Sequence, residues 1–368
     1  MADGVQEDLG RQPVMVDVAR LAGVSQKTVS RVINDAPNVR QVVRERVHQA
    51  IADLGYRRNA AARALVTQQS RVLGVAMPAT TDYGPSAQLF GVETAASDLG
   101  YSVVVASASP SPESFVRAVA RLVDQGVDGL VLSYPYVDDD LSAVQGLHRV
   151  PAVNVGEALT TGLGLPTVTV DQEDGARKVV EHLLALGHRT VHHLAGPTDQ
   201  GAAARRAAAW RDALLRTGAP VAEPLVGDWS ARSGYQVGRA LAADPDVTAV
   251  FAANDQMAVG AMRAFLEAGR KVPADVSVVG FDDAPDSAYQ VIPLTTVRQD
   301  VAAVSRRAVM ALVGAIEDHD GLEGTLRYPV DLVVRASSGP APARLAAGRG
   351  PDPFRTTSTT SPPTAKVG

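Results

Sequence analysis

The chain has 368 residues, of which 46% are hydrophobic and 20% charged, a balance typical of a globular protein with more than one packed unit. It contains no cysteine, which excludes disulfides, thiolate metal sites and cysteine nucleophiles. The sequence shows neither a signal peptide nor an apolar run of about 18 residues that could span a bilayer, so we expect a cytoplasmic protein.

The net charge of −5 is distributed unevenly along the chain. Residues 11–71 hold eleven Lys and Arg against four Asp and Glu, a net charge of +7, which leaves −12 for the rest. A basic module on an acidic body indicates that only the first part meets a polyanion such as DNA.

The first part of this module predicts two short helices joined by a tight turn. Val18, Leu21 and Ala22 form an apolar stripe. Gly23 stands where the first helix must end, because glycine adopts positive φ without steric cost. Ser25 is placed to cap the second helix.

The second helix has one apolar and one polar face. Val29, Val32 and Ile33 face inward, whereas the opposite face carries an amide and two cations but no acid. In the DNA major groove Arg or Lys reads guanine and Gln reads adenine. An ordinary surface helix pair is the alternative, since this pattern is common in helical proteins. We expect these side chains to contact DNA: Ser25, Gln26, Lys27, Thr28, Ser30, Arg31 and Asn34.

Two more helices are expected before the chain enters its main body. A third amphipathic helix has the apolar positions Val43, Val47, Ala50, Ile51 and Leu54, with Arg44, Arg46 and His48 off the stripe and expected near phosphates. A short alanine-rich segment then starts at Asn59, and it is too short to be a stable helix alone. We expect Asn59, Ala62 and Leu65 to contact DNA, with Leu65 as a minor-groove wedge. A plain linker is the alternative.

From Arg71 onward, short apolar runs alternate with helical runs, which predicts parallel sheets covered by helices on both faces. About 270 residues is long for one such sheet, so we expect two lobes. The Pro-, Gly-, Ser- and Thr-rich tail has no leucine heptad, and we expect no packed element in it. We divide the chain into a disordered arm (1–13), a DNA-binding headpiece (14–58), a hinge (59–70), a two-lobed core (71–338) and a disordered tail (339–368).

No catalytic motif is present: the chain has no G-x-S-x-G, P-loop or H-E-x-x-H, so we expect neither an enzyme nor a cofactor. His192 and His193 are adjacent on a predicted strand and point to opposite faces, which suits a metal poorly. Polar residues at strand ends are candidates for a ligand cleft, although a helix cap at Asn254 and Asp255, a turn at Asp282 and Asp283, and core packing of Trp229 are the alternatives.

The segments DVARLAGVSQKTVSRVIN and RRNAAARAL resemble the Lac repressor (LacI/GalR) family of bacterial transcription regulators, and the resemblance extends over residues 14 to about 338. It implies a small all-α helix-turn-helix headpiece and an α/β core of two doubly wound parallel-sheet lobes. This core would be periplasmic-binding-protein-like, with three crossovers and ligand in the cleft. Gln26 and Lys27 match the variable base-reading pair, Arg31 the third base contact and Leu65 the intercalating leucine.

The chain departs from the family pattern in the headpiece. Arg58 stands where the family usually has proline before the hinge asparagine. Arg40 stands where Ser or Thr usually caps the third helix, so we expect a weaker cap there.

Four further segments, GDWSARSGYQ, AANDQMAVGAMRAF, DVSVVGFDDAPDS and PLTTVRQD, are similar to those of lactose-responsive members of the family. Gly156 departs from them, since it stands where they carry a carboxylate near the sugar. The resemblance implies hydroxyl-binding roles for Arg206, Asn254 and Asp282, a stacking role for Trp229, and cleft-lining roles for Ser133 and Gln299.

We therefore expect a homodimeric repressor that binds a roughly palindromic operator and is released by a sugar, first of all a β-galactoside or galactose-type ligand. A different sugar, or a purine-type corepressor that strengthens DNA binding, is the first alternative. A sugar receptor for transport and an enzyme on the same fold are the others.

Overall fold

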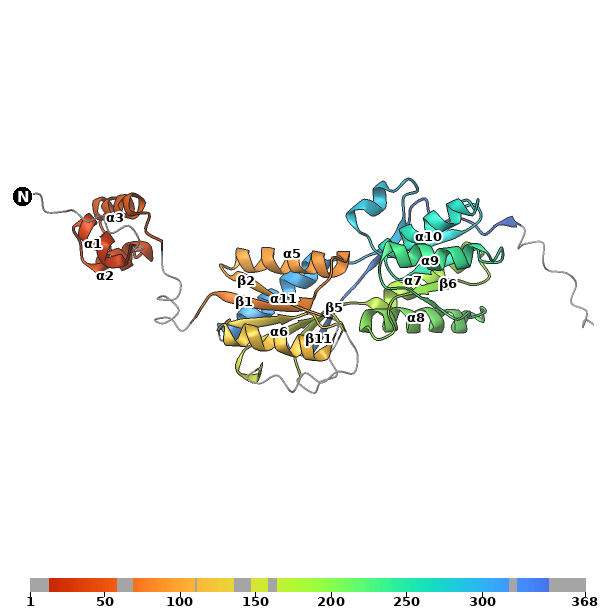
Figure 1. Ribbon diagram of the computed structural model, residues 1–368, viewed down its shortest axis with the longest axis horizontal. Coiled ribbons are helices and arrows are strands. Elements are labelled where there is room, and N and C mark those ends of the chain that lie inside the picture. The colour runs from red at the N-terminus through yellow and green to blue at the C-terminus, as the bar shows by residue number, and fades with distance from the viewer. Residues whose placement is uncertain are drawn as a thin grey trace, which may run out of the picture. The chain divides into compact units, whose positions relative to one another are not determined.

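The computed structural model describes residues 13–57, 69–109, 111–135, 147–157, 164–317 and 323–343, apart from the side chain of residue 148. The chain forms two compact units, residues 1–70 and 71–368 (Figure 1). Most of the expected arm, hinge and tail lies outside the described residues, as do the predicted DNA contacts Asn59, Ala62 and Leu65.

Three helices form the first unit: α1 (Met15–Ala22), α2 (Gln26–Ile33) and α3 (Gln41–Leu54). Gly23 has φ 64° and ends α1 in the left-handed conformation, as its position predicts. Ser25 caps α2, because its Oγ accepts a hydrogen bond of 3.2 Å from the backbone N–H of Thr28. Arg40 precedes α3 and offers no side-chain cap, which confirms the weaker start expected there.

Seven small apolar side chains make the core of this unit: Val18, Ala19, Ala22, Val29, Val32, Val47 and Ala50. The prediction that Leu21 joins this core is wrong, since its side chain is 54% exposed. The buried face of α1 lies around Ala22, and Leu21 is about 100° of helical rotation away from it. Ala19 takes the inward position instead.

Arg44, one of the three residues expected near phosphates, is also bonded within the headpiece. Its Nη1 is 2.5 Å from Oδ1 of Asp35, and its Nη2 donates to the Ala36 carbonyl oxygen at 3.0 Å. The guanidinium therefore holds the turn that follows α2. This places Arg44 among the residues that position the headpiece helices.

The first lobe of the second unit is a six-stranded sheet of order β11-β5-β4-β3-β1-β2, in which every pairing is parallel. Helices α5 and α11 pack on one face and α6 on the other (Figure 1). The elements are β1 (Val72–Pro78), α5 (Tyr83–Asp98), β2 (Ser102–Ala108), α6 (Pro112–Asp124), β3 (Gly129–Leu132), the 3₁₀ turn η2 (Leu147–Arg149), β4 (Ala152–Val155), β5 (Thr167–Val170), α11 (Val301–Ile316) and β11 (Thr325–Tyr328).

The second lobe is a six-stranded sheet of order β12-β10-β9-β8-β6-β7, parallel except for the antiparallel edge strand β12. Helix α7 packs with α8, and α9 packs with α10. The elements are α7 (Gln172–Ala185), β6 (His192–Ala195), α8 (Gly201–Thr217), β7 (Leu225–Val226), α9 (Ala231–Ala242), β8 (Ala249–Ala252), α10 (Asp255–Glu267), β9 (Ser277–Asp282), the 3₁₀ helix η3 (Pro285–Tyr289), β10 (Thr295–Arg298) and β12 (Asp331–Val333).

The chain passes between the lobes three times, as the family resemblance implied. The crossings lie at Asp171 between β5 and α7, at Asp300 between β10 and α11, and at Val330 between β11 and β12. No described helix is long and apolar enough to cross a bilayer.

The packed core continues past residue 338, so the prediction of a disordered tail from Gly339 is wrong at its start. Gly339 is buried, its N–H donates to Ser277 Oγ at 3.0 Å, and its carbonyl oxygen lies 3.1 Å from Nε2 of His188. The N–H of Ala341 donates to the Leu186 carbonyl at 2.9 Å. These hydrogen bonds satisfy the segment's backbone, which its composition alone does not reveal.

Helices α9 and α10 approach each other through glycines. A Cβ atom on Gly260 would lie 2.0 Å from the carbonyl oxygen of Ala231, and one on Gly234 would lie 2.2 Å from that of Met257. Both obstacles are backbone atoms, which cannot move aside as a flexible side chain can. The second lobe therefore depends on these two glycines for its helix packing.

We predict that Gly260→Ala lowers the free energy of unfolding by about 3 kcal/mol, because the added methyl group forces the two helices apart. Thermal and urea unfolding followed by circular dichroism measure the change. Gly84→Ala is the matched control, since Gly84 also lies in a helix but a Cβ there meets nothing within 4 Å. Equal stability of the two variants would contradict this packing argument.

Candidate functional site

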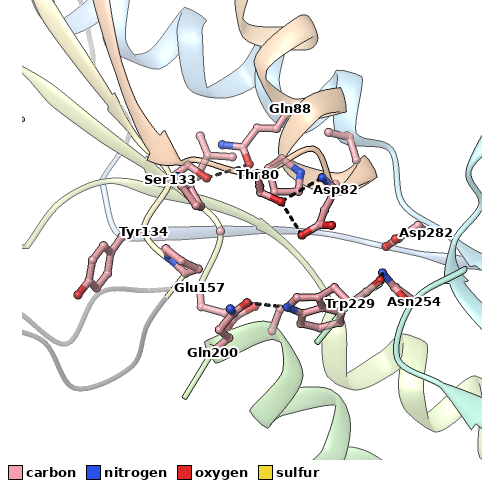
Figure 2. Close-up of a pocket in the computed structure, with 18 of the residues that line it drawn as sticks. Thr80, Asp82, Gln88, Ser133, Tyr134, Glu157, Gln200, Trp229, Asn254 and Asp282 are labelled. Atoms are coloured by element: carbon pink, nitrogen blue, oxygen red, sulfur yellow. Dashed lines mark hydrogen bonds between the residues drawn. The ribbon is translucent and has the colours of Figure 1, made fainter. Parts of the chain in front are cut away.

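A cavity of about 550 Å³ lies between the two lobes of the second unit, at the carboxyl ends of strands from both sheets. In doubly wound sheets ligands bind at this edge. Figure 2 shows side chains of both lobes around this space, among them Ser133 and Glu157 from the first lobe and Trp229 and Asp282 from the second. The six side chains that sequence reasoning assigned to the cleft all line it: Ser133, Arg206, Trp229, Asn254, Asp282 and Gln299.

Arg206, from α8, is the one cationic side chain among the described residues that line this cavity, and it is 4% exposed. Its Nε donates to Gln172 Oε1 at 2.8 Å, and its Nη1 donates to the Ala253 carbonyl oxygen. The guanidinium stacks on Phe281, 3.7 Å from the ring centroid, and its Nη2 is 4.0 Å from Oδ1 of Asp282. Burial lowers the pKa of Arg206, which the nearby Asp282 opposes. The side chain is thus held in one orientation at the cavity wall.

Asp282 ends β9 and is 7% exposed. The Nε2 of Gln299 donates to its Oδ1 at 2.5 Å. Burial raises the pKa of Asp282, while Arg206 and the bond from Gln299 act in the opposite direction. The carboxylate is therefore buried beside a cation and an amide, with a proton affinity well above that of a free aspartate.

Backbone strain gathers near the same edge. Trp229 has φ 73°, Asp282 φ 127° and Asp283 φ 53°, three of the five residues other than glycine with positive φ in the described part of the chain. Such conformations persist only where the surroundings enforce them, and they cluster at ligand sites. Here they aim the side chains of Trp229 and Asp282 at the cavity edge.

Trp229 and Asn254 are held to each other and to α10. The indole N–H of Trp229 donates to Gln200 Oε1 at 2.8 Å, and its backbone carbonyl accepts from Asn254 Nδ2 at 2.9 Å. Asn254 Oδ1 accepts the N–H of Met257, so the helix-cap alternative for Asn254 is correct as well. Asn254 thus lines the cavity while it fixes the tryptophan backbone.

The neighbouring Asp255 has a structural role. It is buried, its Oδ1 accepts from the Thr296 hydroxyl at 2.5 Å, and its Oδ2 accepts from Ser287 Oγ and the N–H of Ala284. These bonds tie α10 to β10 and to the turn after β9. Asp283 is likewise held, by ion pairs with Arg298 and Arg335.

The first-lobe wall contains side chains that sequence reasoning missed. Thr80 donates to Asp82 Oδ2 at 2.7 Å, and Oε1 of Gln88 accepts from the predicted Ser133 at 3.2 Å. Glu157 follows β4 and pairs with Arg205 of the second lobe. The only hint of Glu157 in the sequence was its position next to Gly156, where relatives were expected to carry a carboxylate. Among the described residues the ionisable side chains of the lining, tyrosine aside, are Asp82, Glu157, Asp228, Asp282 and Arg206.

The adjacent histidines do not form a metal site. His193 is buried and stacks on Trp210 and Phe251, with ring centroids 5.2 and 4.6 Å away, and its Nδ1 bonds the Phe251 carbonyl. Burial lowers its pKa to about 4, which keeps the ring neutral. Across the described residues no group of three or more His, Asp or Glu could hold a metal.

The first unit presents the polar face of α2 to solvent. Gln26, Lys27 and Arg31 are exposed, as predicted for this face, and so are Ser25 and Asn34. Thr28 and Ser30 are half-buried: Thr28 bonds Ser25, and Ser30 accepts from Asn34 Nδ2 at 3.4 Å. The exposed side chains of Gln26, Lys27 and Arg31 thus project from a helix whose first turn is capped by Ser25.

Residues 14–59 match the family described as "Bacterial regulatory proteins, lacI family". Residues 180–338 match the periplasmic binding protein-like domain.

Individual relatives match over nearly the whole chain. The lactose operon repressor of Escherichia coli K12 is 40% identical over 328 residues, which are 88% of this chain and 90% of that protein. The HTH-type transcriptional regulator CelR of Thermobifida fusca is 36% identical over 337 residues, 88% of this chain and 96% of that protein.

Two solved structures are similar in fold and sequence. The lac repressor dimer bound to operator and the anti-inducer ONPF has a TM-score of 0.83 and 39% identity, covering 89% of this chain and all of that one. The complex of the transcriptional regulator CelR with cellobiose has a TM-score of 0.67 and 32% identity, with the same coverage.

Burial of Asp282 makes the stability of the folded chain depend on pH. Because its pKa is raised on folding, the folded chain keeps this proton to a higher pH than the unfolded chain does. The contribution of Asp282 to stability is therefore present below the ordinary aspartate pKa of about 4 and is lost as the pH rises through the raised pKa.

The side chain of Asp282→Asn cannot ionise. As the pH is raised from 5 to 9, the free energy of unfolding of this variant should therefore increase relative to that of the wild type. Thermal unfolding of both proteins at a series of pH values measures the difference. A difference that stays constant over this range would show that Asp282 ionises as it does in the unfolded chain.

Proposed function

This chain belongs to the lacI family of bacterial regulatory proteins, and on that premise we propose that it is a transcriptional repressor that a small sugar releases from its operator. It would act in the cytoplasm as a homodimer on a roughly palindromic site. The observation that carries the proposal is one cavity in which a buried guanidinium, a carboxylate, an amide and an indole converge. The named relatives are transcriptional regulators, which supports a non-enzymatic role.

The chemistry of the cavity suits a saccharide. A carboxylate and a guanidinium such as Asp282 and Arg206 hold neighbouring hydroxyl groups by charge-assisted hydrogen bonds. The ring of Trp229 offers an apolar face to the C–H side of a pyranose. Among the described residues of the lining, acidic side chains outnumber the one arginine, which disfavours phosphorylated sugars.

A β-galactoside or galactose-type sugar is the ligand we favour. One relative is named as the repressor of a lactose operon, and its segments were the ones that the site sequences resembled. CelR, whose structure contains cellobiose, supports a different disaccharide as the second candidate. A purine-type corepressor, which would strengthen rather than weaken operator binding, is the third.

The headpiece would read the operator with α2 in the major groove, one helix in each half-site. Gln26 and Lys27 would choose among bases, and Arg31 would contact a guanine edge. The hinge residues Asn59 and Leu65 remain predictions, with Leu65 of each subunit wedged into a central base step.

The cavity would act on DNA binding through the point where the chain enters the core. The backbone N–H of Arg71 donates to Asp128 Oδ2 at 2.8 Å, and its Nη1 donates to Glu317 Oε1 at 3.0 Å. Its guanidinium also lies over Tyr101, 4.8 Å from the ring centroid. Because Arg71 is held to the first lobe, a change in the relative orientation of the lobes would move the start of the hinge.

The test of this function is release of DNA by sugars. The full-length protein is first given a random DNA library, from which its preferred site is selected. Binding of that site is then followed by fluorescence anisotropy during titration with lactose, methyl β-galactoside, cellobiose, ribose and hypoxanthine. We expect a galactoside to release the DNA. Tighter DNA binding with hypoxanthine would favour the corepressor, and no response to any sugar would overturn the proposal.

We predict that Arg31→Ala weakens binding to the selected site by about 1–3 kcal/mol, because one direct base contact is lost. Binding to random DNA should change much less, so the preference for the selected site falls. The same anisotropy assay on both DNAs measures this. Equal losses on the two DNAs would assign Arg31 to the phosphate backbone.

A further inference from the structure

Glu157 is a buried carboxylate at the boundary of the two lobes that has only half of its hydrogen-bonding capacity in use. It follows β4 of the first lobe and lines the cavity, and its side chain is 10% exposed. Its Oε2 forms an ion pair with Nε of Arg205, from α8 of the second lobe. Its Oε1 is buried without a hydrogen-bond partner in the described part of the chain.

The position of this carboxylate is fixed from both sides. In the first lobe the Nδ2 of Asn154 donates to the backbone carbonyl of Glu157 at 2.8 Å. In the second lobe Arg205 is itself held, since its Nη1 is 2.7 Å from Oε1 of Glu173. The unsatisfied oxygen is therefore not the result of a loosely placed side chain.

An unsatisfied carboxylate oxygen in this environment is unfavourable, because buried polar atoms nearly always have a partner. Burial raises the pKa of Glu157, with Arg205 opposing. The terminal torsion of glutamate is broad, so the carboxylate can turn toward the cavity without leaving a preferred side-chain conformation. A hydroxyl group in the cavity would supply the missing donor.

We propose that Glu157 is a specificity-determining residue of the effector site and accepts a hydrogen bond from one hydroxyl of a neutral saccharide. The inference rests on the proposed function, since it assigns a further contact to the same cavity. Figure 2 shows Glu157 beside Gln200 on one side of the view and Asn254 and Asp282 on the other. The carboxylate therefore contacts a part of the sugar different from the part that Asp282 holds.

The ion pair gives this contact a second consequence. Glu157 and Arg205 come from different lobes. A sugar hydroxyl that donates to Glu157 therefore bonds a carboxylate whose ion pair connects the two lobes. An anionic group placed at the same point would face the carboxylate and be repelled. The site thus selects a neutral polyhydroxyl ligand against the phosphate ester of the same sugar.

The test compares Glu157→Gln with Glu173→Gln in the full-length protein. Both remove one carboxylate that pairs with Arg205, but Glu173 does not line the cavity. Isothermal titration calorimetry with lactose, methyl β-galactoside and cellobiose measures affinity. For every sugar that binds the wild type, we expect Glu157→Gln to bind at least 10-fold more weakly and Glu173→Gln to bind within 2-fold of the wild type.

A series of monodeoxy forms of the bound sugar identifies the contact. One deoxy sugar of the series should bind the wild type and Glu157→Gln with equal affinity, because it lacks the hydroxyl that donates a hydrogen bond to Glu157. Unfolding temperatures establish that the variants are folded. If Glu157→Gln unfolds early, Glu157→Asp, which keeps the charge but withdraws it by one methylene, replaces it in the comparison.

The outcomes separate this inference from the proposed function. If the wild type binds sugar and Glu157→Gln binds it within 2-fold, the inference is wrong and the proposed function stands. If both variants weaken equally, the effect runs through Arg205 and Glu157 is not a ligand contact. If no sugar binds the wild type, the proposed function and this inference both fall.

Discussion

A buried guanidinium beside a buried carboxylate is the interaction on which the effector cavity depends. Arg206 bonds Gln172, the first residue of α7, directly after the first crossing between the lobes. Asp282 accepts from Gln299, which lies in the second crossing. The pair Arg206–Asp282 thus links two of the three segments that join the lobes, and any ligand that bonds this pair acts on both.

Burying two charges is costly, and their mutual attraction offsets the cost only when other groups complete their hydrogen bonds. In this chain Arg206 donates hydrogen bonds to Gln172 and to the Ala253 carbonyl oxygen, and its guanidinium also stacks on the Phe281 ring. Asp282 has fewer partners, and burial raises its pKa. Sugar hydroxyls would supply donors to it. Binding would then stabilise one arrangement of the crossings over another, which is what coupling to DNA requires.

The features of the fold that depend on local chemistry could be predicted from the sequence. The short apolar runs that alternate with helical runs after Arg71 form strands, as predicted. Gly23 ends α1 and Ser25 caps α2, as their residue types predict. Their position at strand ends made Asn254, Asp282 and Trp229 candidates for the cleft. The family resemblance was needed to choose the full set of six, because nothing in its spacing distinguishes Asn254 from an ordinary helix cap. That they line one cavity follows from the parallel strand order, which brings strand ends together at one edge.

The features that were missed depend on contacts between residues far apart in the chain. Strand β7 has two residues and β12 has three, too few for any periodicity. Glu157 forms an ion pair with Arg205, which lies 48 residues further along the chain. Gly339 is ordered because Ser277 and His188 bond its backbone. Helix α9 begins within GDWSARSGYQ and rests on glycines that lower helix propensity but permit close packing.

In the function proposed for this chain, the cavity and the DNA-binding face are coupled, and coupling between two binding sites must be reciprocal. The most direct measurement compares two affinities of the sugar that releases the DNA. One is its affinity for the protein alone, and the other is its affinity for the protein saturated with its selected DNA site. We expect DNA to weaken sugar binding by the same factor by which sugar weakens DNA binding. Sugar affinity that is unchanged by DNA would contradict this coupling.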